Sequence, residues 1–206
     1  MDHDLLGPRY PRSVLTGTAA EAFGTVLRFH LDGERVLDPT FGDGISWQGL
    51  VKPSRLVCSD IQEPWRQDVF RLREQHPEYK GAFDLVYFDP PYFACVAASS
   101  DERAGAYGGY TQSYADLSAL IGFAPELAWC LRPGGKIILK CGDQYHVPTR
   151  QLWLHHLEWC RSLERAFRLV DFYIYPFHHV SPTAYQVKDR PSAVVTHSYF
   201  VVGEKA

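Results

Sequence analysis

Long hydrophobic runs are missing from this sequence of 206 residues. No apolar stretch approaches the roughly 20 residues that a helix needs to cross a bilayer. The N-terminal segment MDHDLLGPRYPR also lacks the apolar core of a signal peptide. We therefore expect no membrane association and a cytoplasmic location. Because 46% of the residues are hydrophobic, the chain can still bury a substantial core, and we predict a single domain over residues 1–206.

Cysteine pairs and an excess of positive charge are also lacking. The five cysteines include no CxxC pair, which disfavours both a disulfide framework and a zinc site. We expect no bound metal. The formal net charge of −3 argues against a protein that coats nucleic acid nonspecifically, because such proteins are strongly basic. A localised basic rim is compatible with this charge.

The most informative segment that is present is FDLVYFDPPY, residues 83–92. Its apolar run, Leu85 to Phe88, is typical of a strand buried on both faces of a parallel sheet. Pro90 and Pro91 end that strand, because proline cannot donate to a sheet ladder and holds the preceding residue extended. Asp89 is thereby presented at the carboxyl end of a strand, where open α/β sheets bind their ligands.

The Asp-Pro-Pro-Tyr sequence suits methylation of an exocyclic amino group on a nucleobase. Asp89 and the carbonyl of Pro90 can accept the two N–H bonds of that group. Pro91 adds no competing N–H, and Tyr92 offers a ring on which the base can stack. The alternative interpretation is an incidental strand-to-loop turn capped by Asp89.

These residues resemble the catalytic DPPY motif of the S-adenosylmethionine-dependent amino-methyltransferases, which modify adenine N6, cytosine N4 or, in some RNA enzymes, guanine N2. The resemblance implies that Asp89 and the following carbonyl hold the amino group while Tyr92 stacks on the base. It covers most of the chain from the first predicted strand onward. Enzymes that modify cytosine more often begin this motif with serine, so Asp89 favours adenine without excluding cytosine.

A second motif, DPTFGDG, follows the predicted first strand, Arg35 to Asp38. Its glycines allow a sharp turn and a close approach of the backbone to a ligand. The segment resembles the family's cofactor loop, usually DPF-x-G-x-G, from which Thr40 and Asp43 depart. Asp43 either faces the cofactor's amino group or only stabilises the turn. A dinucleotide fingerprint is the alternative, but it requires a third glycine where this chain has Trp47. The resemblance predicts cofactor contacts from Asp38, Pro39, Thr40, Phe41, Gly42, Asp43 and Gly44.

Further cofactor contacts are expected after the predicted second strand, Arg55 to Cys58. Asp60, followed by Ile61, can accept hydrogen bonds from both hydroxyls of a ribose, although it could instead cap the following turn. The resemblance adds Asp68 for the adenine amino group. It also adds Gly17 and Thr18 near the methionine end of S-adenosylmethionine. For Thr18 the alternative is simple helix capping, since Thr18 and Glu21 form a capping box.

The alternation of strand and helix patterns predicts a doubly wound, Rossmann-like α/β sheet that is mostly parallel. The resemblance implies that its last strand is antiparallel. We place the DPPY motif after the fourth strand. Predicted helices cover residues 18–30, 113–131 with a kink at Pro125, and 149–167, and later strands cover residues 136–140, 169–175 and 193–202.

Two polar segments are expected to form substrate-side loops, residues 93–113 and 176–192, after an N-terminal arm at residues 1–17. Substrate contacts are predicted for Phe93, Tyr107 and Tyr110, which can stack on bases. Lys188 and Arg190 can meet phosphates. The alternatives are solvated loops and solvated turn charges. Neither loop is long enough to be a separate recognition domain, so sequence specificity is expected to be modest or supplied by RNA shape or a partner.

The sequence thus predicts a methyltransferase that uses S-adenosylmethionine and acts on an exocyclic amino group of adenine or cytosine. Nucleic acid is the expected partner. The resemblance favours DNA, and a base in ribosomal or transfer RNA is the alternative. Two competing classes are a dinucleotide-dependent oxidoreductase, which would need the missing third glycine, and a noncatalytic nucleic-acid binder, which should be more basic.

Overall fold

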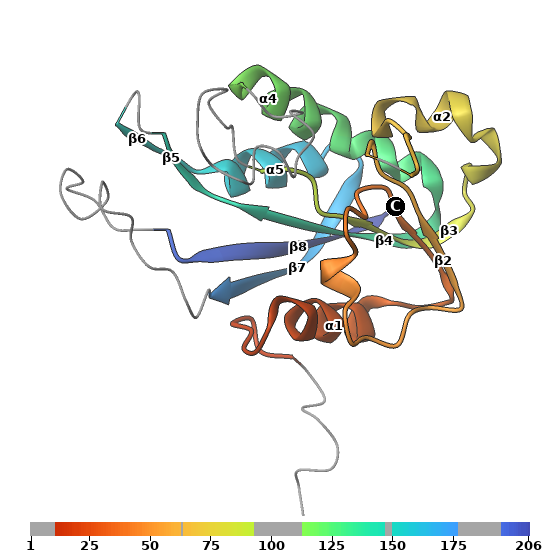
Figure 1. Cartoon of the computed structure of the whole chain (residues 1–206), viewed down its shortest axis with the longest axis horizontal. Helices are drawn as coiled ribbons and strands as arrows, with labels where there is room; N and C mark the ends of the chain where they lie inside the picture. The colour runs from red at the N-terminus through yellow and green to blue at the C-terminus, as the bar shows by residue number, and fades with distance from the viewer. Residues whose placement is uncertain (1–10, 63, 93–112, 147–149, 177–194) are drawn as a thin grey trace, which may run out of the picture.

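The computed structural model describes residues 11–62, 64–92, 113–146, 150–176 and 195–206 (Figure 1). Its main feature is a six-stranded sheet in the order β2-β1-β3-β4-β8-β7. A separate two-stranded hairpin joins β5 to β6. The strands are β1 (Arg35–Asp38), β2 (Arg55–Cys58), β3 (Phe83–Phe88), β4 (Leu131–Gly142), β5 (Gln144–His146), β6 (Gln151–Trp153), β7 (Phe167–Pro176) and β8 (His197–Lys205).

The first four strands of the sheet are parallel, and the last strand of the chain is antiparallel. β1 pairs in parallel with β2 and β3, and β3 with β4. β8 pairs antiparallel with both β4 and β7. The predicted mostly parallel α/β sheet with an antiparallel last strand is therefore confirmed. The bounds of β1 and β2 agree with the prediction, whereas β7 and β8 extend or shift their predicted ranges by several residues.

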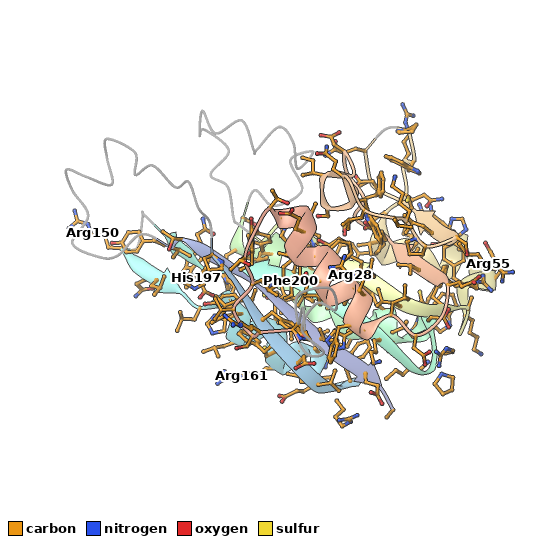
Figure 2. The ribbon with its side chains drawn as sticks, turned by 90° about the horizontal axis from the view of Figure 1, so that it is seen from below. Arg28, Arg55, Arg150, Arg161, His197 and Phe200 are labelled. Atoms are coloured by element: carbon orange, nitrogen blue, oxygen red, sulfur yellow. The ribbon has the colours of Figure 1, made fainter. Side chains whose placement is uncertain are left out.

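One face of the sheet is covered by α1 (Ala19–His30), which Figure 2 views from outside, with Arg28 of α1 and Phe200 of β8 near the centre. The predicted capping box is present, because the Thr18 hydroxyl accepts from the Glu21 backbone N–H and the Glu21 carboxylate accepts from the Thr18 backbone N–H. Phe23 stacks on Tyr87 of β3 with ring centroids 3.9 Å apart. This packing covers the α1 side of β3, the strand that leads into the DPPY motif.

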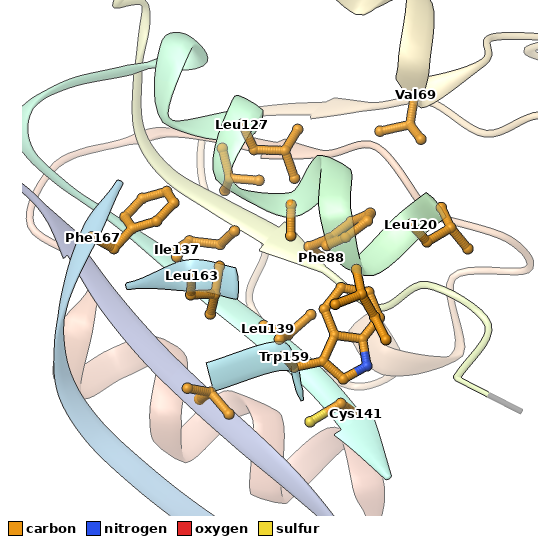
Figure 3. Close-up of a cluster of buried hydrophobic side chains, with 14 of the residues drawn as sticks. Val69, Phe88, Leu120, Leu127, Ile137, Leu139, Cys141, Trp159, Leu163 and Phe167 are labelled. Carbon is orange, nitrogen blue, oxygen red and sulfur yellow. The ribbon is translucent and has the colours of Figure 1, made fainter. Parts of the chain in front are cut away.

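The other face is covered by α4 (Tyr114–Phe123), the 3-10 segment η4 (Ala124–Cys130) and α5 (His155–Leu163). Figure 3 shows the apolar side chains that they bury against Phe88, Ile137 and Leu139 of the sheet. Successive residues of β3 and β4 alternate between the two faces, as a doubly wound sheet requires.

The connection from β2 to β3 forms only short helical turns. These are η2 (Val69–Arg71), α2 (Leu72–Gln75) and η3 (Pro77–Tyr79), and a similar turn, η1 (Ile45–Trp47), lies between β1 and β2. Among the described residues, no strand forms between β2 and β3, so the DPPY motif follows the third strand rather than the fourth. Pro64 and Pro77 interrupt this segment, and proline cannot donate to a ladder.

Two predicted helices are wrong in extent. The helix at 113–131 ends at Phe123 and continues as η4, because Pro125 has no N–H with which to extend the α-helical pattern. The helix at 149–167 is shorter, because the β5–β6 hairpin takes residues up to Trp153 and α5 begins at His155. β4 also begins earlier than predicted and includes Gly134 at φ +71°.

The described end of the predicted N-terminal arm is not a free arm. Ile174 of β7 exchanges backbone hydrogen bonds with Ser13 and Leu15 at 2.7 and 2.8 Å, and Leu15 is buried. These residues thus extend the edge of the sheet beside β7. In the part of the chain described, no helix has both the length and the apolar character needed to cross a membrane.

Candidate active site

A cavity of about 250 Å³ opens at the carboxyl ends of β1, β2 and β3. After β1 the chain turns to β2 on one side and later returns to β3 on the other, so this is the point where the strand order reverses. Open α/β sheets bind ligands at this switch point. The cavity wall contains both sequence motifs, from Asp38 to Asp43 and from Asp89 to Tyr92.

Asp38 lies at the base of the cavity and is almost fully buried, with 1% of its surface exposed. Its Oδ2 accepts a hydrogen bond from Trp47 Nε1 at 2.7 Å, and its Oδ1 accepts from the Thr40 backbone N–H at 3.0 Å. Burial raises the pKa of Asp38 to about 7; these hydrogen bonds oppose that rise, and the nearby charge of Asp89 adds to it. Asp38 therefore serves first to fix the loop after β1.

Thr40 connects the two motifs. Its Oγ1 accepts the backbone N–H of Asp89 at 2.9 Å and donates to Asp38 Oδ1 at 3.4 Å. A hydroxyl can accept and donate at the same time. The first residue of the DPPY motif is thus attached, through one side chain, to the carboxylate that ends β1.

The Asp89 carboxylate is held through one oxygen. Oδ2 accepts from Lys140 Nζ at 2.8 Å, from Tyr87 OH at 3.0 Å and from Ser46 Oγ at 3.3 Å. Within the described residues, no hydrogen-bond donor reaches Oδ1. Burial, followed by the charge of Asp89, raises the pKa of Tyr87 well above its usual value, so Tyr87 stays a phenol that can donate. One Asp89 oxygen is therefore available to a ligand in the cavity.

Asp60 connects the end of β2 to the glycine loop. Its Oδ2 accepts from the Gly42 N–H at 2.8 Å, and its Oδ1 accepts from the Gln62 N–H at 2.9 Å. Gly42 has φ +51°, a conformation that favours glycine. Each carboxylate oxygen can accept a second bond, so the turn-capping role and a ribose contact are compatible. Asp68 caps η2 through the Phe70 N–H at 3.0 Å and also borders the cavity.

The predicted site residues do not all reach the cavity. Gly44 lies just beyond the wall, at φ +68°, where an added Cβ would meet the Phe41 ring at 2.7 Å. Gly17 and Thr18 lie at the start of α1, where Thr18 caps the helix and the Gly17 carbonyl accepts from Tyr175 at 3.3 Å. Neither borders the cavity. The predicted residues that do border it are Asp38, Pro39, Thr40, Phe41, Gly42, Asp43, Asp60, Ile61, Asp68, Asp89, Pro90, Pro91 and Tyr92.

The predicted substrate residues Phe93, Tyr107, Tyr110, Lys188 and Arg190 lie outside the described residues, as do nearly all of both predicted substrate-side loops. The structure therefore leaves these contacts as predictions.

Several residues of the site were not predicted from the sequence, above all Lys140, Tyr87, Ser46 and Trp47. For two of them the alternation of side chains along a strand is a usable signal. Tyr87 precedes Asp89 by two residues and points to the same side, and Lys140 follows Ile138 by two residues and points to the same side. A lysine near the end of one apolar strand, beside a neighbouring strand that is followed by aspartate, is the pattern that predicts the contact between Lys140 and Asp89.

The cavity is strongly acidic. Among the described residues, five acidic side chains border it and one ammonium group, that of Lys140, does so. The acids are Asp38, Asp43, Asp60, Asp68 and Asp89. In the described part of the chain, no group of three or more histidine, cysteine or acidic side chains is arranged to hold a metal ion. The acidic lining favours a ligand that carries positive charge.

No protein-family model matches this chain, and no curated protein is significantly similar to it. Solved methyltransferase structures do match. A candidate DNA modification methylase of Thermus thermophilus, complexed with S-adenosyl-L-methionine, is 21% identical over 61% of this chain and 48% of its own, with a TM-score of 0.36. A methyltransferase from Pyrococcus furiosus is 16% identical over 92% and 84%, with a TM-score of 0.47.

An S-adenosylmethionine-dependent methyltransferase from Mesorhizobium loti is 15% identical over 91% of this chain and all of its own, with a TM-score of 0.44. This chain thus spans about half the length of the Thermus methylase and the full length of the Mesorhizobium enzyme.

Proposed function

We propose that this chain is an S-adenosylmethionine-dependent methyltransferase. More specifically, we propose that it methylates an exocyclic amino group of a nucleobase, adenine N6 or cytosine N4, with DNA as the favoured substrate. The observation that carries this proposal is how the two carboxylate oxygens of Asp89, at the carboxyl end of β3, are hydrogen-bonded. Its Oδ2 is anchored by three donors, and its Oδ1 is available in an acidic cavity.

The charge of the cavity supports this cofactor over a dinucleotide. S-adenosylmethionine carries a sulfonium, an ammonium and one carboxylate and is therefore net positive, whereas a dinucleotide brings a negative pyrophosphate into the site. Pyrophosphates bind at the N-terminus of a regular helix, but the chain after the glycine loop forms only the short turn η1 (Ile45–Trp47). Both observations disfavour the oxidoreductase alternative.

The cavity residues fit the parts of this cofactor. We propose that Asp60 accepts bonds from the ribose hydroxyls, that the loop from Asp38 to Gly42 meets the amino-acid portion, and that Asp68 accepts from the adenine amino group. Gly17 and Thr18 are not included, because they do not border the cavity. When bound, S-adenosylmethionine supplies a methyl group activated by a positively charged sulfur.

The chain's own residues then orient the acceptor. Asp89 Oδ1 and the Pro90 carbonyl accept the two N–H bonds of the base amino group, which directs the nitrogen lone pair toward the methyl group. Pro91 offers no N–H that would compete for that carbonyl, and Tyr92 supplies a stacking surface. Holding two reactants in this geometry removes much of the entropic part of the barrier. No proton has to leave the amine before the methyl group is transferred.

The proposal is tested first by calorimetric titration and then by methyl transfer. We expect S-adenosylmethionine and its demethylated product to bind, and NAD not to bind. With labelled cofactor, we expect label in duplex or single-stranded DNA, and nucleoside mass analysis should find it on adenine N6 or cytosine N4. Total RNA is assayed in parallel, because an exposed RNA base can present the same amino group.

Each result has a distinct meaning. Label in RNA alone would replace DNA as the substrate and leave the chemistry intact. Cofactor binding without label in either nucleic acid would indicate a small-molecule or protein acceptor. Tight binding of NAD, with no response to S-adenosylmethionine, would overturn the proposed function.

A further inference from the structure

We propose that Lys140 is a positioning residue that keeps Asp89 ionised and turns a single carboxylate oxygen toward the acceptor amine. This inference rests on the proposed function of Asp89. It concerns a residue that lies in a different strand, 51 positions further along the chain.

The strand pairing accounts for the contact. Phe88 of β3 is paired with Leu139 of β4, so Asp89, the first residue after β3, lies beside Lys140, which is still within β4. Lys140 Nζ lies 2.8 Å from Asp89 Oδ2, and the two side chains are only 15% and 18% exposed. An ion pair so shielded from water is stronger and less screened by salt than one on the surface.

All the donors converge on the same oxygen. Tyr87 and Ser46 also reach Oδ2, while Thr40 holds the backbone N–H of Asp89. Three donors on one oxygen and a fixed backbone prevent the carboxylate from rotating. Oδ1 is consequently the oxygen that remains for an amine in the cavity.

The charges around Asp89 explain why a cation is needed there. Asp38 approaches from β1 as a second buried carboxylate, whereas Tyr87, Ser46 and Thr40 are neutral. Among the described residues that border the cavity, Lys140 is the one cation that can offset the charge of Asp89. Without it, Asp89 would have to ionise next to a second buried acid with no cation to offset its charge, which favours the protonated form of Asp89.

Ionisation of Asp89 matters for the chemistry. During transfer the nitrogen lone pair forms the N–C bond, the C–S bond breaks, and its electron pair remains on sulfur as a neutral thioether. The nitrogen carries positive charge until its proton passes to water. A carboxylate on Asp89 stabilises that developing charge, whereas a protonated carboxyl would not.

The test compares Lys140→Met with Lys136→Met, a matched control on the same strand. Lys136 Nζ donates to the His30 carbonyl at 3.3 Å and has no contact with Asp89. Carbon-13 NMR of labelled aspartate carboxyls, assigned with Asp89→Asn, follows protonation without relying on activity. We expect Asp89 to take up its proton at a higher pH in Lys140→Met than in the wild type, because the carboxylate has lost its cationic partner, and at the same pH as the wild type in Lys136→Met.

Methyl transfer provides a second readout. At neutral pH we expect a decrease of roughly 10- to 100-fold in Lys140→Met, the equivalent of losing one charge-assisted hydrogen bond. The acid limb of the rate profile should move to higher pH. Cofactor affinity should not fall, because removing a cation does not weaken the binding of a cation. Lys140→Arg retains the charge and should restore the pH profile of the wild type.

Failure of this inference can be told apart from failure of the proposed function. An unchanged Asp89 titration in Lys140→Met would overturn the inference even where the wild type transfers methyl groups. A shifted titration in a protein that transfers no methyl group would support the ionising role of Lys140 and remove the proposed function. If Lys140→Met does not fold, Lys140→Gln keeps a donor without the charge and gives the same comparison.

Discussion

Thr40 illustrates how single residues join the two motifs. In the resembling cofactor loops an aromatic residue stands at this position, so threonine is a departure. The structure shows what the hydroxyl does: it accepts the Asp89 N–H at 2.9 Å and is itself close to Asp38 Oδ1. The contact spans 49 positions of sequence, which is why local pattern alone did not predict it.

Substituting Thr40 should therefore affect catalysis through Asp89. Thr40→Val has nearly the same shape but no hydroxyl, and it leaves the Asp89 N–H without its acceptor. We expect a loss of roughly 1 to 3 kcal/mol of unfolding free energy, together with slower methyl transfer at nearly unchanged cofactor affinity. Urea unfolding and single-turnover kinetics measure the two effects. Thr40→Ser keeps the hydroxyl and should stay close to the wild type; equal rates in the two variants would contradict this role.

Which site residues could be predicted depended on where their partners lie. Asp89 and Asp60 were found because each directly follows an apolar strand and a polar side chain there faces the ligand edge. Lys140 and Trp47 were missed, because their roles arise from strands and turns that meet only in the folded chain. Glycines 42 and 44 were identified from type alone, and both have positive φ.

At the scale of elements, local signals gave the reliable predictions. The starts of α1 and α4 follow from capping boxes, Thr18 with Glu21 and Ser113 with Asp116, which involve only neighbouring residues. The helix predicted at 149–167 failed because its apolar spacing also fits a short hairpin followed by a shorter helix. In the structure Trp159 of α5 is fully buried in the core.

The end of β4 offers a test of how one element positions another. A Cβ placed on Gly142 would lie 2.8 and 3.0 Å from two ring carbons of Tyr92, closer than carbon atoms can pack. We expect Gly142→Ala to displace Tyr92, to raise KM for the nucleic acid and to leave cofactor affinity intact. Lost stacking corresponds to roughly 1 to 3 kcal/mol per base.

Gly122→Ala is the matched control for this variant. Gly122 lies in α4, and nothing lies within 4 Å of an added Cβ there, so this change should stabilise the helix by roughly 0.5 to 1 kcal/mol without altering KM. A Gly142→Ala protein with the KM of the wild type would show that the ring has room to adjust.

At the scale of the whole molecule, the strand order and the charge distribution matter together. The alternation of motifs predicted the parallel sheet, and the sheet brings residues from β1, β2 and β3 to one edge. Composition could not reveal the charge of that edge, because a net charge of −3 is small. Five carboxylates nevertheless border a single cavity, and only the fold brings them together.

Gathering buried carboxylates has a cost that depends on pH. Burial raises the pKa of Asp38 to about 7 from 3.8. In this case the folded state holds a proton that the unfolded chain releases, so the contribution of Asp38 to stability is complete below about pH 4. It is lost as pH rises through 7. At about 1.4 kcal/mol per pH unit, the full effect is roughly 4 kcal/mol.

His30 acts in the opposite direction over part of this range. Burial lowers its pKa below 6.5, Asp171 opposes the change and Lys136 adds to it. The neutral imidazole therefore stabilises the fold above pH 6.5, and that contribution is lost as pH falls. The measured pH dependence of the wild type combines both groups, so Asp38 has to be isolated by a difference between proteins.

Urea unfolding at pH 5, 6, 7 and 8 of the wild type and Asp38→Asn provides that difference. Asparagine does not titrate. Its NH2 group replaces one carboxylate oxygen and opposes either the Trp47 or the Thr40 donor at any pH, so the loss of stability caused by the substitution itself does not depend on pH. We expect the unfolding free energy of the wild type minus that of Asp38→Asn to be largest at pH 5 and to decrease toward pH 8. Only in the wild type does Asp38 give up its proton, and with it this stabilisation, as the pH rises. His30 is present in both proteins and cancels. A difference that is constant across this range would show that Asp38 is already ionised at pH 5 and that its three donors outweigh its burial.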